Sequence, residues 1–182
     1  MMKQQGTVPI ETKRLLLRRF EISDSEAMFR NWAGHPVVTK FLTWDAHQSE
    51  AESRQLLNKW CKQYRKRNFY EWAIELKELG EPIGSIGAVQ VAGWKAFEVG
   101  YCIGDRWWGK ELALEALQAV IRFLFQQVRC HRIQAKYAEG NVASMRVMQK
   151  AGMRPKIGEE VFVSTDKGFF TCPVYEIRNE LT

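Results

Sequence analysis

Residues 110–127 predict a long helix with apolar side chains on nearly every side. Its apolar members are Leu112, Ala113, Leu114, Ala116, Leu117, Ala119, Val120, Ile121, Phe123, Leu124 and Phe125. A helix of this kind is stable only where other elements cover most of its surface. The chain must therefore supply a sheet for it, which restricts the fold to layered arrangements of helices on strands.

The flanking sequence supplies those strands. Runs of branched and aromatic residues predict strands at 12–20, 70–76, 83–91, 97–103 and 132–137, with turns at 78–82 and Gly93. A closing hairpin is expected from 156–163 and 169–178 across residues 166–168. The three central strands should form an antiparallel meander.

Further helices are expected at 23–32, 49–67 and 141–151. Ser23 and Glu26 have the spacing of a capping box, and Gly34, Pro36 and Gly152 mark helix ends. The expected fold class is α/β (α+β mixed sheet): a central, mostly antiparallel sheet with helices on both faces, in a single domain of residues 1–182.

Composition excludes several classes of protein. No stretch reaches the roughly 20 apolar residues that span a bilayer, and residues 1–10 lack the core of a signal peptide. We therefore expect a cytoplasmic protein with reduced thiols and no membrane partner. The four cysteines form no CxxC pair and the three histidines no HxxxH pair, so no metal site is expected. The net charge of +6 favours an acidic partner.

Residues 98–115 form the most informative segment. A strand ends near Ile103, a loop holds Gly104 and Gly109, and the helix begins at about Lys110. Free N–H groups at a helix start bind anions, glycine permits close approach, and Arg106 and Lys110 add positive charge. The pattern indicates a phosphate site, although many helices also begin after a glycine.

Four segments, in order along most of the chain, carry a more specific resemblance. They are residues 11–18 (ETKRLLLR), 98–101 (EVGY), 106–110 (RWWGK) followed by LALEA, and 141–153 (NVASMRVMQKAGM). Together they resemble the GNAT superfamily of N-acetyltransferases, in the RimJ/RimL-type branch, which is named for enzymes that acetylate the N-termini of ribosomal proteins.

The resemblance implies acetyl-CoA as co-substrate and direct acetyl transfer to an amine. The residues it implies for binding acetyl-CoA are Val99, Tyr101, Ile103, Arg106, Trp107, Trp108, Gly109, Lys110, Glu111, Leu112, Asn141 and Ser144. Glu98 would act as catalytic base and Ser144 would protonate the departing thiolate, with Tyr137 as an alternative donor.

Each of these assignments has a structural alternative. Glu98 could pair with a cation, the strand amides could belong to an ordinary ladder, and Asn141 is a preferred N-cap. The family usually has a small residue where this chain has Glu111, whose side chain we expect to point away from the phosphate. The tryptophans at 32, 44, 72 and 94 could line an acceptor pocket, although packing explains them better.

The acceptor is open: a protein N-terminus, ribosomal proteins included, a lysine or a small amine. Two other functions also stay open. The chain could hold acetyl-CoA without catalysis, as a sensor, or it could bind RNA or the ribosome through the cations of residues 59–67. Those cations could equally complement a helix C-terminus. Nucleic acid is not required by the main interpretation, and either a monomer or a homodimer is expected.

Overall fold

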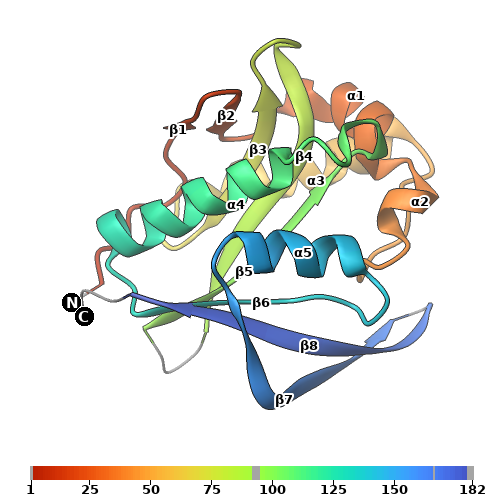
Figure 1. Cartoon of the computed structure of the whole chain (residues 1–182). Helices are drawn as coiled ribbons and strands as arrows, with labels where there is room; N and C mark the ends of the chain where they lie inside the picture. Colours follow the sequence, from red (N-terminus) through yellow and green to blue (C-terminus); the bar gives the residue numbers. More distant parts are fainter. Residues whose placement is uncertain (1, 92–94, 166, 180–182) are drawn as a thin grey trace.

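One eight-stranded sheet organises the chain (Figure 1). The computed structural model describes residues 2–91, 95–165 and 167–179. The strands lie in the order β1-β2-β3-β4-β5-β6-β8-β7. Their bounds are β1 Ile10–Glu11, β2 Leu15–Arg18, β3 Tyr70–Leu76, β4 Glu81–Gln90, β5 Ala96–Ile103, β6 Arg132–Lys136, β7 Arg154–Thr165 and β8 Gly168–Arg178. Neighbours are antiparallel except for β5 and β6, so the expected mixed, mostly antiparallel sheet is confirmed.

Helices cover both faces of this sheet, as expected. The helix α4 (Leu112–Phe123, extended by a wider turn at Leu124–Val128) and α5 (Val142–Lys150) lie on one face. On the other lie α1 (Ser25–Met28, extended by a turn at Phe29–Ala33), α2 (Pro36–Thr39) and α3 (Glu50–Gln63). No helix among the described residues is both long and apolar enough to cross a bilayer.

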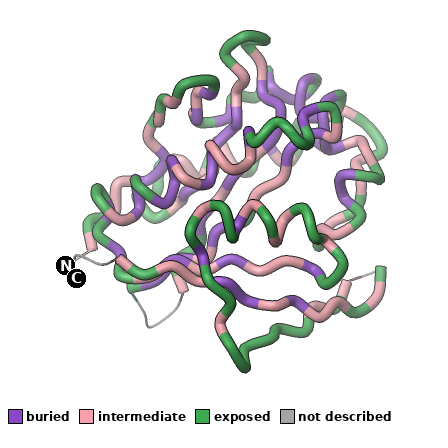
Figure 2. The backbone as a smooth tube through the Cα atoms, viewed as in Figure 1, coloured by how far each residue is buried: buried purple, intermediate pink, exposed green. Residues whose placement is uncertain are grey.

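Each face has its own apolar core, and buried residues line the inner sides of the helices (Figure 2). Under α4, Trp72 and Phe123 meet edge to face with ring centroids 5.7 Å apart. Under α1 and α3, Phe20, Trp32 and Leu57 form a smaller cluster. The cover that the apolar helix at 110–127 required is therefore present, and α4 begins two residues later than expected because Glu111 is left-handed.

Several local predictions need correction. The capping-box prediction at Ser23 is wrong: the N-cap is Glu21, two residues earlier, and the Asp24 carboxylate accepts the Glu21 N–H at 2.8 Å. The helix expected at 49–67 ends at Gln63, and the strand expected at 12–20 is shorter, because its ends leave the sheet. The turn at Gly93 lies outside the described residues.

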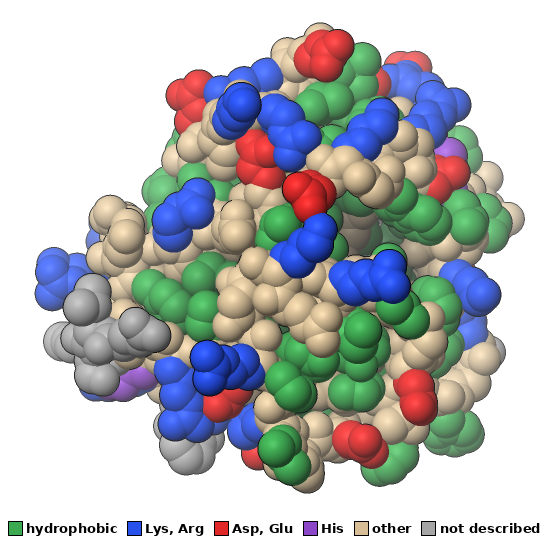
Figure 3. All heavy atoms as spheres, viewed as in Figure 1, with side chains coloured by type: hydrophobic (Ala, Val, Ile, Leu, Met, Phe, Trp, Pro, Cys, Tyr) green, Lys and Arg blue, Asp and Glu red, His purple; other side chains and the backbone are tan. Residues whose placement is uncertain are grey.

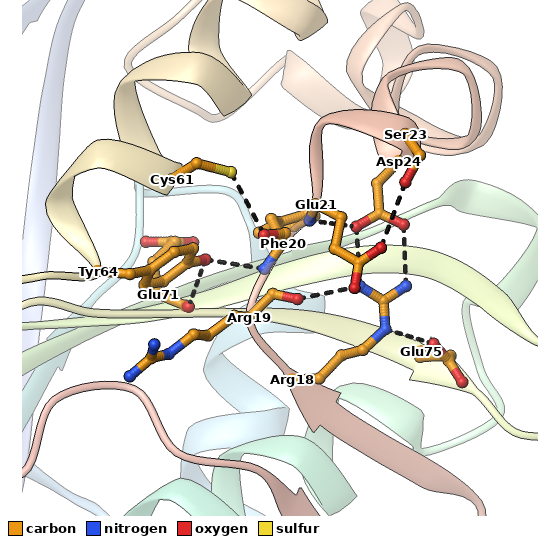
Figure 4. Close-up of polar contacts among 10 residues, drawn as sticks. All are labelled: Arg18, Arg19, Phe20, Glu21, Ser23, Asp24, Cys61, Tyr64, Glu71 and Glu75. Carbon is orange, nitrogen blue, oxygen red and sulfur yellow. Dashed lines mark hydrogen bonds and ion pairs between the residues drawn. The ribbon is translucent and has the colours of Figure 1, made fainter.

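An ion-pair network joins β2 to the turn before α1 and to β3 (Figure 4). The Arg18 guanidinium bonds both oxygens of Asp24, at 2.8 and 2.9 Å, and Nε bonds Glu75 Oε2 at 2.5 Å. The hydrogen bond to Asp24 is the main influence that raises the pKa of Arg18. All three side chains are largely shielded, and the planar guanidinium satisfies both carboxylates at once.

Candidate active site

The parallel strands β5 and β6 separate in the middle of the sheet. They pair only at Ala96↔Arg132, Phe97↔Ile133 and Glu98↔Gln134. Beyond Glu98, β5 stays with β4 while β6 continues along β8. Main-chain groups of residues 99–103 that point toward β6 therefore lose their strand neighbour. A continuous ladder, the alternative for these amides, exists only on the β4 side within the described chain.

A cavity of about 170 Å³ lies at this separation. Side chains alternate along β5, so Glu98, Gly100 and Cys102 face α1–α3 while Val99, Tyr101 and Ile103 face α4 and α5. The lining includes Glu98 and Lys136 from the first face, and Tyr101 and Ser144 from the second. The cavity therefore reaches both sides of the sheet.

The predicted anion loop lies between β5 and α4. A short turn at Asp105–Trp107 follows Gly104, and two left-handed residues, Gly109 (φ 76°) and Glu111 (φ 61°), curve the backbone into the helix. The first hydrogen bond inside α4 runs from Glu115 N to Glu111 O at 3.0 Å, so the N–H groups of residues 112–114 point out of the helix end. Figure 3 shows the surface hollowed between this helix end and α5, with Lys and Arg side chains beside the hollow.

Glu115 connects the start of α4 to the N-terminal segment. Its carboxylate accepts hydrogen bonds from Thr12 Oγ1 at 2.7 Å, Arg14 N at 2.8 Å and Arg14 Nε at 2.7 Å. Partial burial opposes ionisation, but these bonds outweigh it and lower the pKa of Glu115. Arg14 Nη1 also donates to Lys110 O at 3.0 Å. The N-terminal segment therefore fixes the loop, a role that the sequence reasoning missed.

The Glu111 side chain reaches toward α5. Its Oε1 lies 2.5 Å from Lys150 Nζ, and both side chains are more than half exposed. The hydrogen bond and charge of Lys150 lower the pKa of Glu111. The left-handed backbone at Glu111 is a conformation that glycine adopts without strain, which explains why a small residue suits this position.

Tyr101 and Ser144 meet across the cavity. Tyr101 OH lies 3.1 Å from Ser144 Oγ and 3.1 Å from Ser144 O. Burial raises the pKa of Tyr101 to about 12, so its hydroxyl stays protonated at neutral pH. The pair joins β5 to the first turn of α5. Sequence reasoning named both residues, but not their contact.

Glu98 is engaged by β6. Its Oε1 lies 2.6 Å from Lys136 Nζ, and its Oε2 accepts from Gln134 Nε2 at 3.1 Å. The cation-paired alternative is therefore the arrangement present. Asn141 likewise caps α5, its Oδ1 accepting the Ser144 N–H at 3.2 Å, and Tyr137 packs edge to face on Tyr175.

Most of the tryptophans pack. Trp32 and Trp72 are fully buried, Trp107 is nearly so, and Trp44 lies against His47. Trp108 is half exposed and donates its indole N–H to Ile103 O at 2.9 Å, which ties the loop to β5. Packing is thus confirmed for Trp32 and Trp72, whereas position 94 lies outside the described residues.

A second, larger cavity of about 750 Å³ lies between the α2 region and the β7–β8 hairpin. Phe41 and Phe170 line both cavities. Lys167 joins the two walls: its Nζ donates to Thr39 O and Trp44 O, both at 2.7 Å, and lies 3.3 Å from Asp45 Oδ1. Nothing in the local sequence around Lys167 predicts these contacts, because they span more than a hundred residues.

The separated sheet, the glycine-bearing loop at the start of α4 and the cavity between them form an arrangement that could bind an acyl donor on one face and an acceptor on the other. The chain matches the family model of the acetyltransferase (GNAT) domain over residues 14–154, and it belongs to this family. It is therefore an N-acetyltransferase of the GNAT fold, and the resemblance carried by the four sequence segments is confirmed.

Similar proteins agree with this assignment. The chain is 30% identical to the N-acetyltransferase YnaD of Bacillus subtilis over 145 residues, covering 80% of this chain and 82% of that one. A GNAT-family acetyltransferase structure from Bacillus anthracis covers 94% of this chain and 98% of its own, with 25% identity and a TM-score of 0.80. This chain also has a shorter match to the ribosomal protein uS5-alanine N-acetyltransferase of Escherichia coli. The two are 41% identical over 54 residues, which cover 30% of this chain and 28% of that one.

Proposed function

We propose that this enzyme transfers the acetyl group of acetyl-CoA directly to a primary amine, on a protein N-terminus or a small molecule. The observation that carries the proposal is the separation of β5 from β6, because it opens the sheet to both faces at one point. A thioester can enter from the α4–α5 face and an amine from the other. The whole chain acts as one domain, in the cytoplasm, without a metal.

The anion loop of residues 106–112 would hold the diphosphate of acetyl-CoA. Its support is the outward N–H groups at the start of α4, the left-handed turn at Gly109, and the charges of Arg106 and Lys110. The amides of the pantetheine arm would pair with the open edge of β5 as an added strand does, at Val99, Tyr101 and Ile103. The same edge would donate a hydrogen bond to the thioester oxygen.

Ser144 would protonate the departing thiolate. Its hydroxyl lines the cavity and contacts the protonated Tyr101 hydroxyl, which would replace the proton that Ser144 gives up. Asn141 orders this turn by capping α5. Glu98 lies on β5, on the face opposite to Tyr101. Its contacts with Lys136 and Gln134 hold its carboxylate beside the expected thioester position.

The larger cavity would admit the acceptor. It adjoins the smaller one through Phe41 and Phe170, on the side of the sheet that Glu98 faces. The partial match to the ribosomal protein uS5-alanine N-acetyltransferase makes a ribosomal protein N-terminus a candidate acceptor. The sensor alternative has less support, because the hydroxyl pair and Glu98 line the cavity.

Calorimetry with acetyl-CoA, followed by thiol release with a panel of N-terminal peptides and small amines, tests the proposal. We expect binding and amine-dependent thiol release. Binding without release for any amine would favour the sensor. Salt-dependent RNA binding without acetyl-CoA binding would favour the RNA-binding alternative.

A further inference from the structure

A second carboxyl group lies on the face that the acceptor would use. Glu71 of β3 pairs with Gly87 of β4, and Gly87 pairs with Gly100 of β5, so the three residues form one row across the sheet. Side-chain alternation places Glu71 on the same face as Glu98, which lies two residues before Gly100. The row therefore leads from Glu71 to the cavity, which Gly100 lines.

Two glycines leave this row open. A Cβ at Gly87 would collide with Glu71 Oε2, so the carboxyl group lies directly over Gly87. A Cβ at Gly100 would meet nothing within 4 Å, and Gly100 is exposed. Residues opposite each other on neighbouring strands have Cβ positions about 5 Å apart. One water molecule over Gly100 can therefore bridge the Glu71 carboxyl group and the cavity.

The environment of Glu71 suits a proton acceptor better than that of Glu98. Glu98 is bound by Lys136 and Gln134, whereas burial raises the pKa of Glu71 to about 8, a rise that a hydrogen bond with Ser85 only partly offsets. A base is most effective when its pKa lies near the working pH.

The groups around Glu71 come from three elements. Ser85 lies on β4 and Cys102 on β5, and the Cys102 thiol has a raised pKa through burial. Tyr64, just past α3, donates its hydroxyl to Glu71 O at 3.0 Å (Figure 4). Arg19 lies over the Tyr64 ring, 5.4 Å from its centroid. Tyr64 itself stays protonated, because burial raises its pKa.

We propose that Glu71 accepts the proton of the acceptor ammonium through a water over Gly100, an inference that rests on the proposed acetyl transfer. The neutral nitrogen then attacks the thioester carbon, the C–N bond forms and the C–S bond breaks. The proton on Glu71 passes to solvent. The second proton that nitrogen loses is balanced by the one that the thiolate receives through Ser144.

The test compares two acceptors, an alkylamine that is protonated at neutral pH and an aromatic amine that is not. We expect Glu71→Gln to lower kcat/KM for the alkylamine at least about tenfold, and much less for the aromatic amine. It should also remove the rise of kcat with pH near pH 8. Acetyl-CoA affinity should stay unchanged, because Glu71 lies on the other face of the sheet.

Two further variants separate this role from alternatives. Gly87→Ala must displace the Glu71 carboxyl group while keeping it, so it should reproduce the selective loss. Glu98→Gln should lower kcat/KM by the same factor for both amines and should keep the rise of kcat with pH. Equal losses for both amines in Glu71→Gln, or loss of the pH rise in Glu98→Gln alone, would overturn the inference. A wild-type enzyme that acetylates no amine would instead overturn the proposed function.

Discussion

The buried carboxyl group of Glu71 gives the molecule a measurable pH dependence of stability. Burial raises its pKa from the ordinary value of 4.5 to about 8 in the folded protein. Between these values the folded protein holds a proton that the unfolded chain has released. Rising pH therefore favours the unfolded state across this window, and the effect is absent below it and constant above it.

The size of the effect follows from the shift. At about 1.4 kcal/mol for each pH unit, the window corresponds to at most about 5 kcal/mol. Glu71 is only half-buried by surface area, so water reduces this figure, and we expect about 2 kcal/mol. Glu71→Gln carries no ionisable group, so its free energy of unfolding should lack this decline.

Urea unfolding followed by tryptophan fluorescence, between about pH 5 and pH 9, measures the difference. The free energy of unfolding of the variant should rise relative to that of wild type from pH 5 upward, and the difference should become constant above pH 8. Glu78→Gln, in the exposed turn after β3, is the matched control and should parallel wild type. Parallel curves for Glu71→Gln would refute the reasoning, because they would mean that the carboxyl group ionises as it does in water.

Three further outcomes are expected. Ser144→Ala lowers kcat by tenfold or more, about 1.4 kcal/mol, with little change in acetyl-CoA affinity; undiminished turnover would remove Ser144 from the mechanism. Glu111→Gly tightens acetyl-CoA binding by roughly twofold to fivefold, since it removes a carboxylate beside the diphosphate and frees Lys150; calorimetry showing equal or weaker binding would contradict this. Lys167→Met raises the acceptor KM by roughly fivefold with kcat little changed, because the cavity walls lose their tie; steady-state kinetics with an unchanged KM would show that the tie does not shape the acceptor site.

The sequence predicted the long elements well, because periodicity reports burial. Residues 70–76 form β3 with the predicted bounds, and α5 and the start of α4 lie within two residues of expectation. The end predicted for α4 is reached only with the wider turn at Leu124–Val128. Short elements were missed: α2 has four residues and β1 two, too few for a periodic pattern. The α3 boundary was wrong because the cations after Gln63 suit a solvent-exposed loop as well as a helix end.

The site was predictable where it is local. The glycine loop before α4 has a recognisable order, and Asn141 with Ser144 is a recognisable cap. Contacts between distant segments were not predictable: Lys136 with Glu98, and Tyr101 with Ser144. They depend on where β6 leaves β5, and that point is set by packing across the whole sheet.

The early parting of β5 and β6 also has an energetic consequence. A sheet that continued to Ile103 would gain further main-chain hydrogen bonds, so the unliganded enzyme gives up stability at its centre. A molecule whose own amides complete that edge restores the missing bonds and binds only the native form. Ligands that pair with the open edge of β5 should therefore raise the melting temperature. The rise should be larger for fragments of the acetyl donor that keep more of its amide groups.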